Sequence, residues 1–173
     1  MSPGLVIVNT GDGKGKTTAA LGMVLRALGH GMRVLVVQFI KSSSNTGELA
    51  SLNVMDGVVV QVAGLGFLND PEIGMEEHRE AARKALEAVK EGLASEEYDM
   101  VVADEVLLAV KENLLTEGDV TDLIATRPEP VHLVLTGRGC PDTIIDAADT
   151  VTEMKEIKHA YAEGVKAQKG VEY

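Results

Sequence analysis

Short apolar runs alternate along the chain with longer segments in which apolar residues recur at helical spacing. The short runs predict strands at residues 5–9, 33–39, 58–62, 98–105, 132–136 and 150–154. The longer segments predict helices at residues 16–29, 76–94, 106–115, 120–125 and 141–148. Strands that alternate with helices form a mostly parallel sheet with right-handed crossovers. We therefore expect an α/β fold with helices flanking the sheet, and a single domain over residues 1–173.

A glycine-rich segment joins the first predicted strand to the first predicted helix. Glycines let several backbone N–H groups point inward, and the helix N-terminus adds about half a positive charge. Lys16 adds a full charge, and the Thr17 hydroxyl can bind a divalent cation. Strand, glycine loop and helix together predict a phosphate-binding loop, although a plain glycine turn before a helix is the alternative. The loop residues are Gly11, Asp12, Gly13, Lys14, Gly15, Lys16, Thr17 and Thr18.

The loop departs at one position from the usual pattern G-x-x-x-x-G-K-[ST]. Counted back from Gly15, the first glycine should stand at position 10, where the chain has Thr10. Gly11 comes one residue late. The loop can still hold phosphate, but its first turn need not match that of an ordinary ATPase.

Composition and charge exclude several classes of protein. A net charge of -11 repels a nucleic-acid backbone, and three Tyr, two Phe and no Trp are too few for a base-stacking platform. No apolar run approaches the roughly 20 residues of a membrane span. The first residues lead directly into a predicted strand, so we expect no secretory signal. The lone Cys140 excludes an internal disulfide and is expected to be a neutral thiol, so we expect a cytoplasmic protein.

Several polar segments follow predicted strands, and these segments are expected at the carboxyl edge of the sheet, where parallel sheets bind ligands. They are the phosphate loop and residues 41–47, 64–69, 104–105 and 137–139. Asp104 and Glu105 end an apolar strand, so either carboxylate could hold Mg²⁺; capping of the next helix is the alternative. The sequence does not decide which acid is the closer ligand.

Three further residues have two interpretations each. Arg138, between two glycines, could reach a phosphate or ribose or be a surface arginine. Arg26 on the first helix could contact the nucleotide or form a surface salt bridge. Phe67, in the second glycine-bearing loop, could fill a small gap in the core or cover a flat ligand, and its position alone favours the core.

The motifs, in this order, resemble those of the ATP:corrinoid adenosyltransferase family along nearly the whole chain. The similar segments are residues 9–20, 37–41, 46–48, 104–105, 135–139, 151–155 and 164–173. The late glycine is normal for this family. The resemblance implies a RecA-like fold, often a homodimer, that transfers the 5′-deoxyadenosyl group of ATP to Co(I) of a corrinoid. Inorganic triphosphate leaves, and a separate protein could supply the reductant.

The resemblance also implies roles for particular residues. Residues 11–18 would hold the polyphosphate, with Lys16, Thr17 and Glu105 catalytic and Thr17 and Glu105 serving Mg²⁺ or Mn²⁺. Arg26 and Arg138 match positions near the nucleotide. Phe67 matches the first residue of an aromatic pair beneath the corrin, and Asn69 stands where the family often has tryptophan. A small-molecule kinase or ATPase, or a nucleotide-binding module without turnover, are the alternatives.

Overall fold

The computed structural model describes residues 3–42 and 46–172 of the chain. Part of the predicted loop 41–47 and the terminal residues Met1, Ser2 and Tyr173 lie outside the described residues. The strands are β1 (Val6–Thr10), β2 (Val34–Gln38), β3 (Val58–Val62), β4 (Met100–Asp104), β5 (His132–Thr136) and β6 (Thr150–Glu153). They form one sheet in the order β3-β2-β4-β5-β1-β6, and every pairing is parallel. The prediction of a parallel α/β sheet is therefore confirmed.

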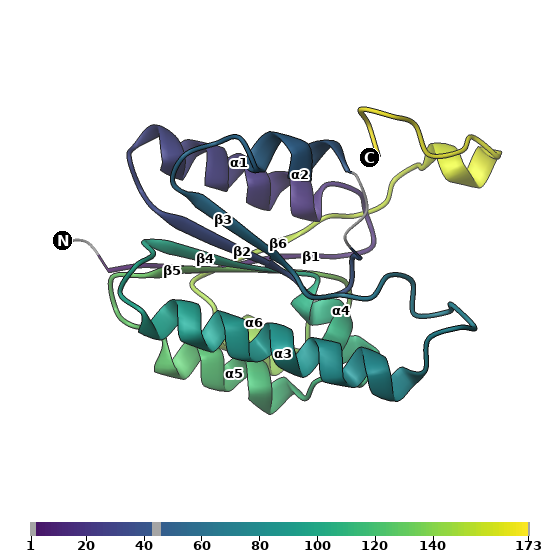
Figure 1. Ribbon diagram of the computed structural model, residues 1–173. Helices are drawn as coiled ribbons and strands as arrows, with labels where there is room; N and C mark the ends of the chain where they lie inside the picture. The colour runs from purple at the N-terminus through teal and green to yellow at the C-terminus, as the bar shows by residue number, and fades with distance from the viewer. Residues whose placement is uncertain (1–2, 43–45, 173) are drawn as a thin grey trace.

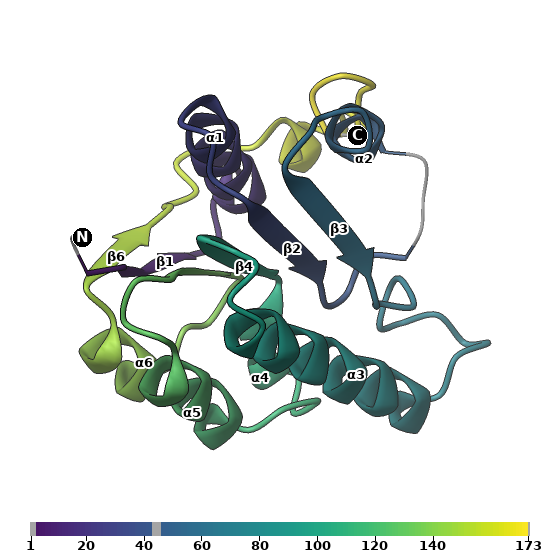
Figure 2. The same ribbon diagram turned by 60° about the vertical axis from the view of Figure 1, so that its left-hand side comes forward.

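Helices cover both faces of this sheet (Figure 1). Helices α1 (Lys16–Gly29) and α2 (Gly47–Leu52) lie on one face. The other face carries α3 (Met75–Ala94), α4 (Val106–Lys111), α5 (Glu117–Thr126) and α6 (Asp142–Ala147). A short 3-10 helix, η1 (Ala160–Glu163), follows the sheet, and the tail beyond it ends beside α2 in both views (Figures 1 and 2). In the described part of the chain, no helix has the length and hydrophobicity of a membrane span.

Burial explains why the central strands are apolar almost without interruption. All five residues of β2 and of β4 are buried, because helices cover both of their faces. One core cluster lies beneath α3, α4 and α5 and includes Leu86, Leu107 and Leu123. The second lies beneath α1 and includes Ala20 and Val24. These two cores fix the carboxyl ends of β1, β2, β4 and β5 at one edge.

The structure differs from the sequence-based prediction mainly in the short helix α2 and in the ends of the helices. Helix α2 was not predicted, since its six residues are too few to show a helical period. Helix α5 begins earlier than predicted because Thr116 and Asp119 form a capping box. Helix α4 ends at Lys111 rather than near 115. Strand β6 lies at one edge of the sheet and is exposed along its whole length.

Candidate functional site

The phosphate loop begins where β1 ends, and its backbone explains the late glycine. Thr10 is still part of the strand, where a side chain fits, and its hydroxyl accepts a hydrogen bond from the Cys140 N–H at 3.3 Å. The chain turns at Gly11, whose φ of 96° lies in the left-handed region. Gly15, with φ 113°, is the N-cap residue of α1. The glycines therefore stand where the backbone needs them, one residue later than in the usual pattern.

The loop also packs against the end of the outermost strand. The Gly13 N–H donates to the Met154 carbonyl oxygen at 2.7 Å. A β-carbon on Gly11 or Gly13 would collide with this same carbonyl. The exposed strand β6 thus supports the loop from outside, and this close contact excludes larger residues at both positions.

Lys16 lies inside the curve of the loop. Its side chain is buried, with the residue 7% exposed, and its ammonium donates to the carbonyl oxygens of Gly11 at 2.7 Å and Gly13 at 2.8 Å. Burial, with a smaller contribution from the Arg138 charge, lowers the pKa of Lys16, against the attraction of Glu105. The ammonium is therefore held at the place where the loop would receive a phosphate.

Asp104 is the hydrogen-bonding centre beneath the loop. It is 1% exposed, and its Oδ1 accepts from the hydroxyl of Thr17 at 2.8 Å and of Thr136 at 2.7 Å. Its Oδ2 accepts from Gln38 Nε2 at 3.3 Å. Asp104 thereby joins the ends of β2, β4 and β5 to the first turn of α1. Of the two acids, Asp104 is the one in direct contact with Thr17.

Glu105 follows in a strained conformation. Its φ of 65° is left-handed, and its N–H donates to the Thr136 hydroxyl at 2.9 Å. Such conformations cost free energy and gather at functional sites. Burial, followed by repulsion from Asp104, raises the pKa of Glu105, and its Oε2 is buried without a hydrogen-bond partner. This carboxylate oxygen is left to accept a ligand.

Sequence reasoning missed an ion pair on the opposite side of the site. Lys41, just beyond β2, places its ammonium 3.2 Å from Glu48 Oε1 and 3.6 Å from Asp104 Oδ2. Burial alone would lower the pKa of Lys41, but the Asp104 and Glu48 carboxylates outweigh it and raise the pKa. The position of Lys41 after a buried strand was the available signal. Glu48 gave none, because it lies on the unpredicted α2.

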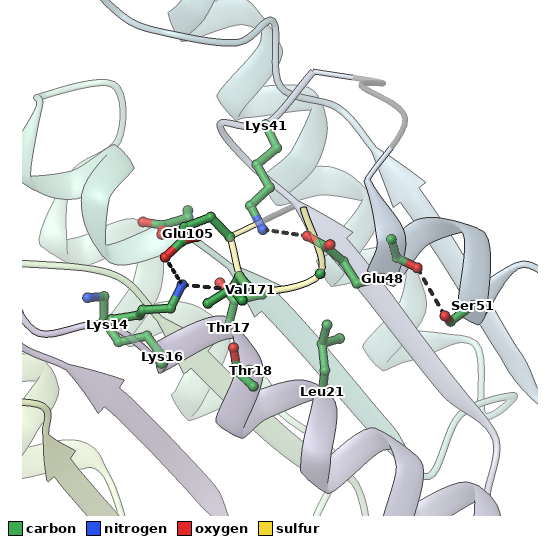
Figure 3. Close-up of a pocket in the computed structure, with 14 residues that line it drawn as sticks. Lys14, Lys16, Thr17, Thr18, Leu21, Lys41, Glu48, Ser51, Glu105 and Val171 are labelled. Carbon is green, nitrogen blue, oxygen red and sulfur yellow. Dashed lines mark hydrogen bonds and ion pairs between the residues drawn. The ribbon is translucent and has the colours of Figure 1, made fainter. Parts of the chain in front are cut away.

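These groups surround a pocket of about 550 Å³ (Figure 3). That volume is typical of small-molecule sites. The walls come from the phosphate loop, α1, the segment after β2, α2, the residue that follows β4 and the C-terminal tail. The lining residues are Lys14, Gly15, Lys16, Thr17, Thr18, Leu21, Lys41, Gly47, Glu48, Ser51, Glu105, Gly170, Val171 and Glu172. The sequence-predicted loop residues 14–18 and Glu105 are brought together here.

Other predicted site residues lie outside this pocket. Arg138 is exposed but close enough that its charge contributes to the lowered pKa of Lys16 and partly opposes the raised pKa of Glu105. Asp12 is exposed on the outer side of the loop, beside Glu153 and Lys155. Arg26 is exposed in the last turn of α1, roughly 15 Å along the helix from Lys16 at 1.5 Å per residue.

Phe67 is 83% exposed, so the interpretation that it fills a gap in the core is wrong. Its neighbour Leu68 is the residue that packs against the core. Asn69 is exposed in the same loop. The backbone N–H of Gly66 donates to the Ile40 carbonyl at 2.9 Å, which ties this loop to the end of β2 near Lys41.

The donor set around Thr17 fits a divalent cation with oxygen ligands. A hydroxyl and two carboxylates converge there, and one carboxylate oxygen, Glu105 Oε2, is without a partner. Within residues 3–42 and 46–172, no group of three or more histidine, cysteine or acidic side chains is arranged to hold a metal ion. A cation here would thus need further ligands from a bound polyphosphate or from water. Cys140 is half-buried, and burial raises the pKa of its thiol to about 11, so it is neutral as predicted.

Comparison with known proteins agrees with this geometry. A family model described as ATP:corrinoid adenosyltransferase BtuR/CobO/CobP matches residues 2–173. A corrinoid adenosyltransferase of Pseudomonas aeruginosa is 44% identical, covering 98% of this chain and 84% of its own length. One from Escherichia coli K12 is 43% identical over 98% and 86% of the two chains. The corrinoid adenosyltransferase CobA of Salmonella typhimurium is 44% identical with the same coverage.

A solved structure supports the fold alone. The KaiC-like protein of Pyrococcus horikoshii superposes with a TM-score of 0.51 and 18% identity, covering 91% of this chain and 75% of that one. The expected RecA-like phosphate-loop fold is therefore confirmed. The family model matches residues 2–173, and these three relatives are more than 40% identical, so the chain belongs to the ATP:corrinoid adenosyltransferase family.

Proposed function

We propose that this protein transfers the 5′-deoxyadenosyl group of ATP to the Co(I) ion of a corrinoid, in the synthesis or salvage of adenosylcobalamin. The observation that carries the proposal is a preformed polyphosphate pocket, built from Lys16 and the residues around Asp104, in a chain that matches the family from residue 2 to 173. Co(I) attacks C5′ with its own electron pair, the C5′–O5′ bond breaks, and triphosphate leaves. The protein needs no nucleophile of its own; it has to orient ATP and stabilise the leaving charge.

The position of the positive charge favours a reversed ATP molecule. In a kinase the bond that breaks lies between the β- and γ-phosphates, but here it lies at the other end of the polyphosphate. With the α-phosphate where a kinase keeps the γ-phosphate, the developing negative charge falls beside Lys16, Thr17 and the N-terminus of α1. C5′ then points towards the loop that carries Phe67.

Thr17, Asp104 and Glu105 would hold magnesium or manganese. The Thr17 hydroxyl, the Asp104 carboxylate and the unpartnered Glu105 oxygen are the oxygen ligands that these ions prefer. A bound divalent cation would neutralise charge on the phosphates. Lys16 and Lys41 flank the same position and contribute fixed positive charge.

The corrinoid is assigned to the side of the Phe67 loop. An aromatic side chain that is 83% exposed beside a nucleotide pocket is free to lie against a flat macrocycle, and exposed Asn69 lies next to it. Arg138, exposed beside Lys16, is assigned to the nucleotide. Arg26 stays a weaker assignment, because within one chain it lies far from the phosphate loop.

Assembly and electron supply complete the proposal. A single domain over residues 1–173 is part of the proposal, and it is supported by the one sheet that holds the six strands of the described residues. A homodimer is proposed from the family resemblance, and exposed apolar side chains such as Leu25 on α1 and Val59 on β3 are candidates for its interface. A separate reductant protein or a chemical reductant is proposed as the source of Co(I). The expected location is the cytoplasm.

ATP hydrolysis or phosphoryl transfer is the second candidate. Glu105 favours it, because a buried carboxylate of raised pKa beside Thr17 could act as a general base. One experiment separates the candidates: incubation with ATP, Mg²⁺ and a chemically reduced corrinoid under anaerobic conditions. We expect the adenosylcorrinoid spectrum and triphosphate by phosphorus NMR. ADP and phosphate as the main products would contradict the proposal, and so would a nucleotide bound without turnover.

A further inference from the structure

The last residues of the chain lie on the phosphate loop, although the mechanism above gives them no role. We define the C-terminal strap as residues 165–172, which follow the left-handed Gly164. Gly170, Val171 and Glu172 line the nucleotide pocket, and Val171 is labelled there in Figure 3. All residues of the strap are exposed, so its position depends on a few polar contacts rather than on a core.

Hydrogen bonds within the strap shape its end. The N–H groups of Val171 and Glu172 donate to the Gln168 carbonyl at 3.1 and 2.9 Å. In return, Glu172 Oε2 accepts from the Gln168 N–H at 2.8 Å. This hydrogen bond, with a smaller contribution from Lys14, holds the pKa of Glu172 below its ordinary value. Glu172 is therefore presented as an ionised carboxylate, with its other oxygen turned to the phosphate loop.

Lys14 connects the phosphate loop to this strap. Its ammonium donates to the Val171 carbonyl at 2.9 Å and lies 3.4 Å from Glu172 Oε1. The lysine side chain is 44% exposed, and in isolation its flexible stem would sample many rotamers. Two acceptors on the strap fix the ammonium at the pocket wall, next to Lys16.

The strap could block the pocket or form part of its wall. The size of the pocket decides between these two interpretations. With the strap in place, about 550 Å³ remains open, within the range of small-molecule sites. A blocking segment would fill that space. We propose that the strap is a wall of the ATP site, and that Glu172 is a positioning residue that holds the Lys14 ammonium for the polyphosphate. The inference rests on the proposed function for the identity of its ligand.

The test measures binding of ATP, and separately of inorganic triphosphate, by calorimetry without corrinoid. We compare the intact chain with Glu172→Gln, Lys14→Ala and the double variant. Removing the Glu172 charge should weaken triphosphate binding about three-fold, the scale of a partly exposed ion pair. Because Glu172 acts through Lys14, the double variant should bind no more weakly than Lys14→Ala alone. A chain that ends at residue 169 should resemble Glu172→Gln or bind more weakly.

Glu163→Gln is the matched control, since Glu163 lies in the same tail but pairs with Lys158 at 2.8 Å outside the pocket. It should leave binding unchanged, and thermal melting should show every variant folded. Tighter binding by Glu172→Gln would overturn the proposal in favour of a blocking strap. Unchanged binding, or additive losses in the double variant, would also overturn it. Failure of corrinoid conversion by the intact chain would contradict the proposed function, but it would leave this binding test unaffected.

Discussion

The two sides of the proposed active site are built in opposite ways. On the phosphate side, Lys16 and Asp104 are buried and each makes at least two hydrogen bonds within the protein. On the side assigned to the corrinoid, Phe67 is 83% exposed and Asn69 is also exposed. The first side is held by contacts within the protein, whereas these two side chains of the second side are open to solvent.

The difference follows from the chemistry that each side has to perform. Stabilising the charge of a leaving triphosphate requires dipoles and cations that are already in place, because reorganisation during the reaction would cost free energy. A large flat macrocycle instead needs an accessible apolar surface. If this comparison is right, substitutions on the phosphate side should affect stability and ATP binding, whereas substitutions near Phe67 should affect only the corrinoid.

The largest effect is expected for Lys16→Ala. Losing the fixed cation of the loop should reduce turnover by roughly 100-fold or more, on the scale of one lost transition-state donor. ATP binding should also weaken, measured by calorimetry with Mg²⁺ present. ATP affinity equal to that of the intact chain would contradict the assignment of the phosphate loop.

Gly11→Ala should be the next most damaging change. The new β-carbon meets the Met154 carbonyl and sits at a φ of 96°, so the free energy of unfolding should fall by about 2–4 kcal/mol. Gly31→Ala is the matched control, because its φ is 75° but nothing lies within 4 Å. Denaturant titration should show only the backbone cost for Gly31→Ala, about 1–2 kcal/mol. Equal losses would mean that β6 does not confine the loop.

Phe67→Ala should separate the two sides directly. We expect roughly ten-fold weaker corrinoid conversion, comparable to one lost aromatic contact, with unchanged ATP affinity and melting temperature. Val54→Ala is a suitable control, since Val54 is also 83% exposed but lies after α2. A variant that loses thermal stability together with both activities would restore the core interpretation of Phe67.

The smallest effect concerns pH. The folded-state pKa of Glu105 is raised above 4.5, mainly by burial, so the ionised form is disfavoured in the folded protein. The folded state therefore loses stability as pH rises through this raised pKa, and that stability is fully present below pH 4.5. Glu105→Gln should be more stable than the intact chain at pH 7, and the difference should shrink towards pH 4. Denaturant titration without nucleotide or Mg²⁺ measures this difference in the free energy of unfolding. A difference that grows towards low pH would contradict the raised pKa of Glu105.

The sequence predicted that the glycine loop and the two acids lie together, because the signals for both are local. A β-branched run, three glycines and Gly-Lys-Thr lie within one short segment, and Asp104-Glu105 directly end an apolar strand. Alternation of strands and helices was sufficient for the parallel sheet. Element boundaries were less accurate: the side-chain cap at Thr116 moved the start of α5, and a six-residue helix went unrecognised.

What the sequence determined by itself is the fold class, the phosphate loop and the acids beside it, since each depends on neighbouring residues. Only the tertiary structure decided that Asp104 rather than Glu105 bonds Thr17, that Lys41 pairs with Glu48, and that Phe67 faces solvent. It also brought the strap onto Lys14, across 157 residues of chain. Such contacts depend on how the sheet order and crossovers place distant segments in space, and no local pattern of residues encodes that placement.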